Sequence, residues 1–272
     1  MPASGQVQRD GALTRNTRAM LMVWRRDIIR LFRMPTRLIS GIAQPLLFLL
    51  VLGAGLEAAI GNRGAGGVDY QQYLFPGILA MSVLTSSLFS SMAIVWDREF
   101  GFMREMLVAP VSRSSIVLGK ALGGGSVSVF QGIVLVAAAP IVGVSFTVGS
   151  FFEMFGLLLL LAFSLTAFGM VIASRMQRME SFQMVMALVM QPMLFLSGAI
   201  FPLVKLPDWL GVITRLNPAT YGVDAIRRAV LPSAAKLTIF DWTVPIWADA
   251  LFTVAFGALM LTLAVKLFAK TE

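Results

Sequence analysis

The sequence predicts an all-α membrane protein with six spanning helices. Hydrophobic residues make up 57% of the 272 residues and charged residues only 13%, about half the charged share of a typical soluble domain. Several runs of roughly 20 apolar residues carry no charge, which is the length that crosses a bilayer as a helix. These runs are continuously apolar, whereas strands of a membrane barrel alternate apolar and polar residues.

Five uncharged runs are long enough to span outright, and a sixth reaches that length by including Asp249. Small and polar residues between Gly143 and Ser150 predict the turn that separates the third span from the fourth. The whole chain, 1–272, is expected to form a single domain. Its predicted spans are 38–56, 73–96, 121–143, 154–174, 181–204 and 246–268.

The distribution of basic residues predicts that both termini lie in the cytoplasm. With the N-terminus inside, the inner segments hold 16 Lys and Arg and the outer loops hold 6. The long outer loop counts least in this rule, and without it only Arg63 remains outside. The net charge of +8 therefore indicates contact with the inner membrane surface, and no nucleic-acid partner is expected.

The first 37 residues carry most of that positive charge and predict an amphipathic helix that ends at Pro35. Such a helix lies in the headgroup plane with its arginines toward anionic lipid. Two roles stay open: an anchor that only fixes topology, or a lever that also contacts a cytoplasmic partner. The residues assigned to this interfacial helix are Trp24, Arg26, Arg30 and Arg33.

The inner segment 97–110 combines charges of both signs with an apolar stripe at helical spacing and ends at Pro110. A connector that only reverses the chain needs no amphipathic helix, so we expect this segment to dock into a soluble partner. A solvated connector is the alternative. The residues assigned to docking are Glu99, Phe100, Met103, Arg104 and Glu105.

Two blocks of this sequence resemble the type-2 class of ABC exporter permeases, most closely the daunorubicin-resistance type of drug-efflux permease. The first block resembles the family's cytoplasmic coupling helix and reads Glu99-Phe100-Gly101, Arg104-Glu105 and Leu107-Val108-Ala109-Pro110, with Gly119-Lys120 after it. The second resembles the signature after the fifth span and reads Phe195-Leu196-Ser197-Gly198-Ala199-Ile200-Phe201-Pro202, Leu206-Pro207-Asp208-Trp209-Leu210 and Asn217-Pro218-Ala219-Thr220-Tyr221-Gly222-Val223-Asp224-Ala225-Ile226-Arg227. Ala219 departs from the family, which usually has a larger apolar residue there.

The resemblance implies two copies of the permease paired with two cytoplasmic ABC ATPase subunits. ATP and Mg²⁺ would then bind the partner, and this chain would be neither an enzyme nor a cofactor-binding protein. The sequence agrees, because the Gly119-Lys120 pair lacks the other residues of a P-loop. Ser114 stands where the first glycine belongs, and Ala121 where the hydroxyl residue belongs.

The spans carry no ionisable residue near their centres, which disfavours ion-driven transporters and channels. The cargo is therefore expected to be apolar or amphipathic. Methionine-rich helix faces suit promiscuous apolar binding, although ordinary packing explains them equally well. The candidate cargo path comprises Gln44, Met186, Met190 and Met193.

Breaks at Gln191-Pro192 and Ser197-Gly198 predict that the fifth span ends irregularly at its outer side. The following segment, 205–245, is expected to form short helices that lie on the outer face or partly re-enter the membrane. Trp209 and Tyr221 would lie at headgroup level. The residues assigned to this outer region are Pro202, Trp209, Asn217, Pro218 and Tyr221.

The chain contains no cysteine and no histidine, which excludes disulfides, metal sites with Cys or His ligands, and His-based catalysis. Together these features predict a permease of the cell inner membrane that exports a drug-like amphipathic compound. A lipid-linked polysaccharide or another lipid is the alternative cargo. A membrane scaffold or sensor that binds a soluble partner without transport is the alternative from another class.

Overall fold

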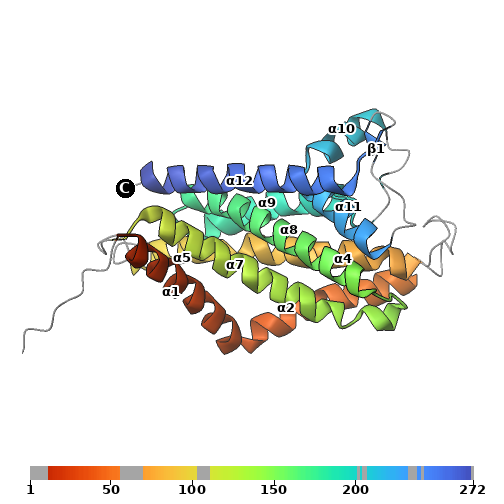
Figure 1. Cartoon of the computed structure of the whole chain (residues 1–272), viewed down its shortest axis with the longest axis horizontal. Helices are drawn as coiled ribbons and strands as arrows, with labels where there is room; N and C mark the ends of the chain where they lie inside the picture. Colours follow the sequence, from red (N-terminus) through yellow and green to blue (C-terminus); the bar gives the residue numbers. More distant parts are fainter. Residues whose placement is uncertain are drawn as a thin grey trace, which may run out of the picture.

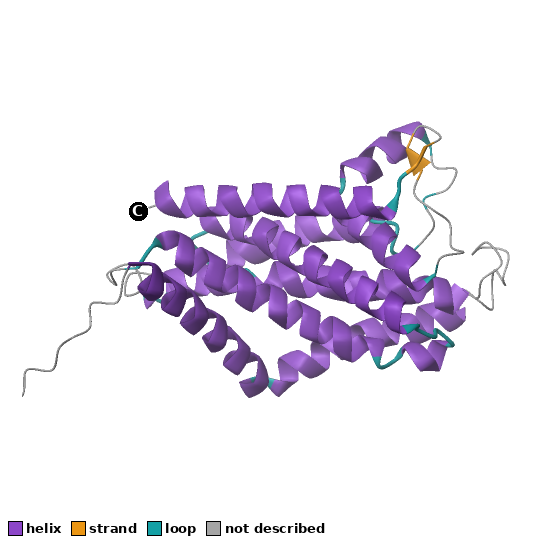
Figure 2. Ribbon diagram, in the orientation of Figure 1, coloured by secondary structure: helices purple, strands orange, loops and turns teal. Residues whose placement is uncertain are grey.

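The computed structural model describes residues 12–55, 70–102, 111–200, 203, 207–231, 238–239 and 242–270. Nearly all of this part of the chain is helical, and the long helices run side by side along one axis (Figure 1; Figure 2). Six helical segments in it are long and apolar enough to cross a membrane. The predicted all-α fold with six spans is therefore confirmed for the described residues.

The spans are assembled from eight helical elements. The first span joins α2 (Pro35–Leu47) to the π-helical turn η1 (Phe48–Leu52), and the second joins α4 (Tyr70–Ser90) to α5 (Met92–Glu99). The remaining four spans are α7 (Arg113–Val136), α8 (Val148–Arg175), α9 (Met179–Leu196) and α12 (Ile246–Lys270).

The third span begins before the start of the uncharged run that predicted it. The hydroxyl of Ser112 accepts a hydrogen bond from the backbone N–H of Ser115 at 3.2 Å and caps α7, as serine commonly does. Consequently Arg113 and Lys120 lie within the helix, although our prediction had placed both in the inner loop. The turn before α8 was predicted correctly at Gly143, which adopts a φ of 71°.

Three prolines lie inside the helices of the spans, Pro45, Pro76 and Pro192, and only the first coincides with a distortion. In the first span, the π-helical turn η1 begins three residues after Pro45, and proline commonly disturbs the hydrogen-bond ladder in this way. We expected Pro192 to break the fifth span, but α9 continues through it to Leu196. Prolines are tolerated inside membrane helices where neighbouring groups satisfy the freed carbonyls.

The spans α4, α7 and α8 form the interior of the bundle. Its fully buried side chains include Tyr73, Phe75, Leu158 and Phe182. The first, fifth and sixth spans bury far fewer residues, and they expose large apolar side chains such as Leu188. Exposed apolar faces of this size suit lipid tails or a further helix rather than water.

The predicted N-terminal amphipathic helix is present as α1 (Ala12–Arg33), and α2 begins at Pro35 as expected. Helix α1 runs obliquely along α7 (Figure 1). The predicted apolar stripe is divided, however, because Leu31 is buried whereas Leu21 and Phe32 are exposed. One face of α1 is therefore used for packing onto α7, and only part of the stripe is left to contact lipid.

After α9 the chain folds back onto the end of the bundle at which α4 and α12 begin. Here α10 (Asp208–Leu216) leads to α11 (Pro218–Val230), and β1 (Thr238–Ile239) pairs antiparallel with β2 (Trp242–Thr243). Nearly every residue of α11 is buried, among α4, α8 and α12. The predicted outer helices therefore exist, and α11 is an internal element of the bundle.

Two arginines hold α11 in place. Arg227 donates hydrogen bonds to the carbonyls of Gly198 and Ala199 at 2.6 and 3.2 Å, and its guanidinium lies 4.2 Å from the ring centre of Tyr73. Arg228 forms ion pairs with Asp224 and, at 2.8 Å, with Asp249. Asp249 is the one acid in the sixth predicted span, and its carboxylate is thus paired with an arginine of the preceding helix α11.

Candidate functional site

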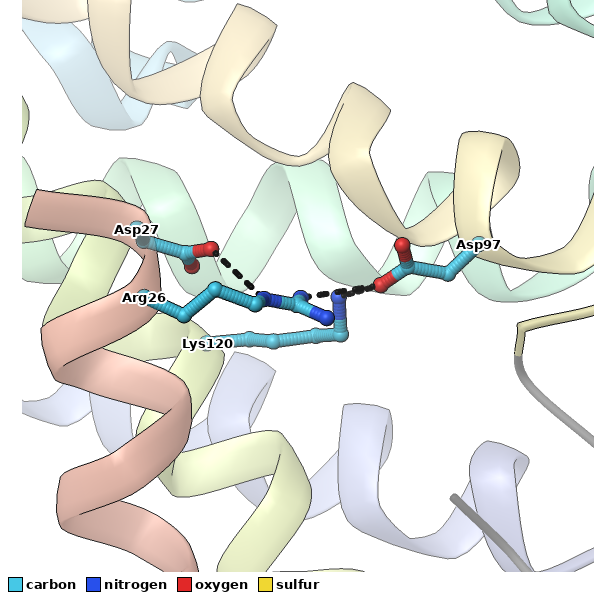
Figure 3. Close-up of polar contacts among 4 residues, drawn as sticks. All are labelled: Arg26, Asp27, Asp97 and Lys120. Carbon is cyan, nitrogen blue, oxygen red and sulfur yellow. Dashed lines mark hydrogen bonds and ion pairs between the residues drawn. The ribbon is translucent and has the colours of Figure 1, made fainter. Parts of the chain in front are cut away.

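Four charged residues meet at the end of the bundle where α5 ends and α7 begins (Figure 3). Asp97 of α5 accepts a hydrogen bond from Arg26 of α1 at 3.1 Å and pairs through the same oxygen with Lys120 of α7. Arg26 also lies 3.6 Å from Asp27. We call these four residues the inner charge cluster. It joins three helices that are far apart in sequence.

Glycines on α7 allow α1 to approach closely enough for this pairing. A Cβ atom at Gly119 would lie 2.7 Å from the carbonyl oxygen of Met20, and one at Gly123 would lie 2.5 Å from the carboxylate of Asp27. Distances this short are not tolerated between nonbonded heavy atoms of this kind, so the close packing requires glycine at both positions. Lys120 follows the first glycine directly and so reaches the same junction.

Two of its four residues are shielded from water, whereas the side chain of Arg26 is 43% exposed. Asp97 is 5% exposed and Lys120 is 4% exposed. Burial raises the pKa of Asp27, against the lowering effect of Lys120 and Arg26. Because buried charges are costly when unpaired, removal of one partner typically destabilises by about 3–5 kcal/mol. The four residues therefore depend on one another.

Residues in the last turn of α5 also contact three further helices, α8, α12 and α9. Arg98 donates to the carbonyls of Ser174 and Met176 at 3.1 and 2.6 Å, where the cation matches the negative end of α8. Its guanidinium lies 6.0 Å from the ring of Phe268 in α12. Glu99 accepts a hydrogen bond from the backbone N–H of Met179 at 3.0 Å, at the start of α9. Three consecutive residues thus tether five helices.

This arrangement changes the interpretation of the docking residues. We expected Glu99 to pair with a soluble partner, but its carboxylate already bonds within the chain, at the exposed end of α9. Phe100 is 64% exposed and follows the tethered turn directly, so it is available for docking. Met103, Arg104 and Glu105 lie outside the described residues.

The interfacial-helix residues do not share one environment. The indole N–H of Trp24 donates to the hydroxyl of Ser126 on α7 at 3.1 Å. Arg30 lies 5.4 Å from the ring centre of Trp96, whereas Arg33 is exposed at the end of α1. We expected these arginines to face anionic lipid. Arg26 and Arg30 also contact α5, although the side chain of Arg26 remains 43% exposed.

A cavity of about 570 Å³ lies beside α4 and is bordered by α2, α7 and α9. Its residues on the second span extend from Ile78 to Trp96. At 1.5 Å per residue this is a length of about 27 Å, close to the thickness of the hydrocarbon core. The cavity is therefore a narrow groove along the spans, with a volume typical of ligand sites.

Only one residue of the predicted cargo path lines this groove. Gln44 does so, together with Gln131 and Gln191 from two other helices. Met186 and Met193 are buried in the bundle core, and Met190 packs against that core. The methionine face of α9 therefore serves helix packing and does not line the cavity.

The predicted outer residues have mainly structural contacts. Asn217 caps α11 by accepting from the N–H of Ala219 at 3.1 Å, and it donates to the carbonyl of Met193 at 2.9 Å. Pro218 occupies the first helical position, which suits its fixed φ. Tyr221, expected at headgroup level, is instead buried, and its hydroxyl donates to the carbonyl of Arg215. The remaining residues are Trp209, which is exposed, and Pro202, which lies outside the described residues.

Sequence reasoning missed the inner charge cluster. It assigned Lys120 to a loop because a charge was taken to end a span. The available signal was the spacing of Gly119 and Gly123, one helical turn apart, on either side of a lysine in an apolar run. Small residues at this spacing are typical of a close contact between membrane helices.

The inner charge cluster predicts a specific stability pattern. Asp97→Asn should lower the thermal unfolding midpoint of the purified protein in detergent, because Lys120 and Arg26 lose their counter-charge. The double variant Asp97→Asn with Lys120→Met should recover much of that loss, since the buried lysine charge is also removed. Asp208→Asn, at an exposed acid of α10, is the matched control. A double variant no more stable than Asp97→Asn would contradict the pairing.

Comparison with known proteins agrees with this architecture. The family model described as "ABC-2 type transporter" matches residues 18–231. The chain is 35% identical to "Putative transport permease ycf38" of Cyanophora paradoxa, over 76% of this chain and 72% of that protein. Identity to "Nodulation protein J" of Rhizobium meliloti (strain 1021) is 29%, over 82% of this chain and 85% of that protein.

These matches support the resemblance at the level of the family. The names of these relatives do not specify the narrower drug-efflux type. The match extends from α1 to the end of α11 and so includes the inner charge cluster and the cavity lining. The chain belongs to the ABC-2 type transporter family and is a multi-pass membrane permease subunit.

Proposed function

We propose that this chain is the membrane subunit of an ATP-driven exporter that moves an apolar or amphipathic compound outward. Two copies would work with two cytoplasmic ABC ATPase subunits, which bind ATP and Mg²⁺. The drug-efflux type is part of this proposal, and a lipid-linked polysaccharide or another lipid is the alternative cargo. The observation that carries the proposal is the tethering of the docking segment to five helices.

Through these contacts, motion of the docking segment would be transmitted to the helix bundle. A partner that moves Phe100 would act on the turn immediately before it, in which Asp97, Arg98 and Glu99 are bonded to other helices. Because close-packed elements transmit displacement rather than absorb it, motion at the docking segment would reach α1, α7, α8, α9 and α12 together. A connector without such contacts would move alone.

The exposed spans support the proposed pairing of two copies. Ile39 and Val51 in the first span, and Met184 and Leu188 in the fifth, are more than 60% exposed. A second copy related by two-fold symmetry would present the same faces and could cover them. Lipid would cover whatever the partner leaves exposed.

We also propose that the protein resides in the cell inner membrane with both termini in the cytoplasm, as the basic-residue bias indicates. Thr17 of α1 and Gly149 at the start of α8 are exposed at opposite ends of the bundle. A Cβ at Gly149 would meet no atom within 4 Å, so a cysteine fits there. An impermeant thiol reagent applied to intact cells should label Gly149→Cys, and it should label Thr17→Cys only after permeabilisation. The reverse pattern would refute the orientation.

The docking role of Phe100 predicts loss of the ATPase without loss of the permease. Phe100→Ala removes an exposed aromatic anchor and should weaken ATPase binding by at least about tenfold. Export should fall accordingly, while the amount of inserted permease stays unchanged. The measurement is the ATPase copurified per permease, together with transport in vesicles.

Phe152→Ala is the matched control, because Phe152 is 65% exposed at the other end of the bundle. It should leave the ATPase bound. If Phe100→Ala retains the ATPase and full transport, the coupling assignment is wrong. A permease that copurifies with no ATPase at all would favour the scaffold or sensor alternative.

A further inference from the structure

The turn between α8 and α9 presents two arginines whose charges are not used inside the described part of the chain. This turn comprises residues 175–178, and we call it the basic turn. Arg175, Gln177 and Arg178 are all exposed. Among the described residues, the side chains of Arg175 and Arg178 form no hydrogen bond or ion pair. Two guanidiniums therefore point a positive charge outward from this end of the bundle.

The backbone of the basic turn is held by the last turn of α5. Arg98 donates to the carbonyl of Met176 at 2.6 Å, and Glu99 accepts from the backbone N–H of Met179 at 3.0 Å. The next residue is Phe100, which is 64% exposed. The exposed aromatic ring of the docking segment and the two arginines thus belong to one fixed junction.

The helix ends around the basic turn add to its positive charge. The guanidinium of Arg98 lies 6.0 Å from the ring centre of Phe268, and Arg113 donates to the carbonyl of Phe268 at 3.5 Å, so α7 and α12 also meet here. Apart from the inner charge cluster, the described residues at these ends are more often basic than acidic. The basic ones include Arg98, Arg113, Arg175, Arg178 and Lys266, and the acidic ones are Glu99 and Glu180. Such a surface attracts an acidic partner.

The length of α8 indicates that the basic turn stands clear of the membrane. Its 28 residues extend about 42 Å, whereas the hydrocarbon core is about 30 Å thick. The opposite end of α8 is apolar, because Val148 and Phe152 are exposed there, and it suits the hydrocarbon border. The surplus of about 12 Å therefore projects at Arg175, beyond a headgroup layer of roughly 5–8 Å. A soluble protein meets the basic turn more readily than lipid does.

We propose that the basic turn is a second docking point for the ATPase subunit, and that it contacts an acidic surface of that subunit. Phe100 supplies the apolar contact, and Arg175 and Arg178 supply the charged contact beside it. Paired charges at an interface fix the register of the two partners, so this contact sets the orientation of the ATPase on the permease. The inference rests on the proposed function, because its partner is the exporter's ATPase.

The two contacts differ in how they respond to salt. Attraction between exposed charges is screened by salt, whereas the burial of an aromatic ring is not weakened by it. The test separates the ATPase that copurifies and titrates it onto the full permease in phosphatidylcholine nanodiscs. Dissociation constants are measured at about 0.05 M and about 0.5 M sodium chloride, between which the screening length falls several-fold.

Reversing both charges should weaken binding in a salt-dependent way. The double variant Arg175→Glu with Arg178→Glu should raise the dissociation constant about 10–30-fold at the lower salt concentration, since each attraction becomes a repulsion. The effect should shrink at the higher concentration. The double variant Arg175→Lys with Arg178→Lys keeps both charges and should bind as the wild type does. Phe100→Ala should instead weaken binding by a similar factor at both concentrations.

Arg33→Glu is the matched control, because it reverses an exposed arginine at the end of α1, away from the basic turn. It should leave the dissociation constant unchanged. The amount of inserted permease is measured for every variant, so that a loss of binding is not confused with a loss of protein.

A second measurement does not depend on weakened binding. The chain has no cysteine, so Gln177→Cys can carry a benzophenone at one defined place in the basic turn. On illumination of the permease–ATPase complex it should cross-link to the ATPase, at a peptide rich in Asp and Glu. Gly149→Cys, at the other end of the bundle, should give no such product.

Binding by the double Glu variant that equals the wild type at low salt would overturn the inference, and the bound ATPase would leave the exporter proposal standing. Cross-linking of the Gln177→Cys probe to lipid alone would overturn it as well. So would an equal loss of binding in Arg33→Glu, since that would indicate a general effect of positive charge. If the wild-type permease binds no ATPase, the exporter proposal fails and this inference fails with it.

Discussion

The architecture depends on satisfying three consecutive charged residues at the end of α5. Asp97 is buried between an arginine and a lysine, Arg98 bonds to the carbonyls at the end of α8, and Glu99 accepts from the first turn of α9. Because a buried charge such as that of Asp97 is costly to leave unpaired in a bundle of apolar helices, these helix ends meet here. Phe100 and the rest of the docking segment follow this junction directly.

At the opposite end of the bundle, buried charged side chains again hold helices together, and here they fix α11. Arg227 and Arg228 fix α11 to the turn after α9 and to the start of α12. The groove lies between these two charged ends, and its lining carries amides and hydroxyls instead of paired charges. Charged junctions at both ends, and between them a groove lined mainly by apolar and uncharged polar side chains, suit a permease whose docking end is moved by a partner while its spans enclose a cargo.

Much of the fold could be predicted from the sequence, because the thickness of the bilayer sets the length of an uncharged run that crosses it as a helix. The helices α1, α10 and α11 were also foreseeable from amphipathic spacing and from the Asn217-Pro218 cap. Contacts between distant segments were not, since nothing local pairs Asp97 with Lys120 or Arg228 with Asp249. The methionine face of α9 was misleading for a related reason: helical spacing shows that residues share a face, but not whether that face meets a cavity or the core.

The central claim is that the inner ends of the helices move as one unit with the docking segment. Spin labels at Thr17 of α1 and Ser181 of α9, both exposed, can be followed by pulsed electron resonance in the permease–ATPase complex. On addition of a non-hydrolysable ATP analogue, the distance between these labels within one chain should stay constant. The distance between the Ser181 labels of the two copies should change. A change within the chain, without any change between copies, would contradict the account.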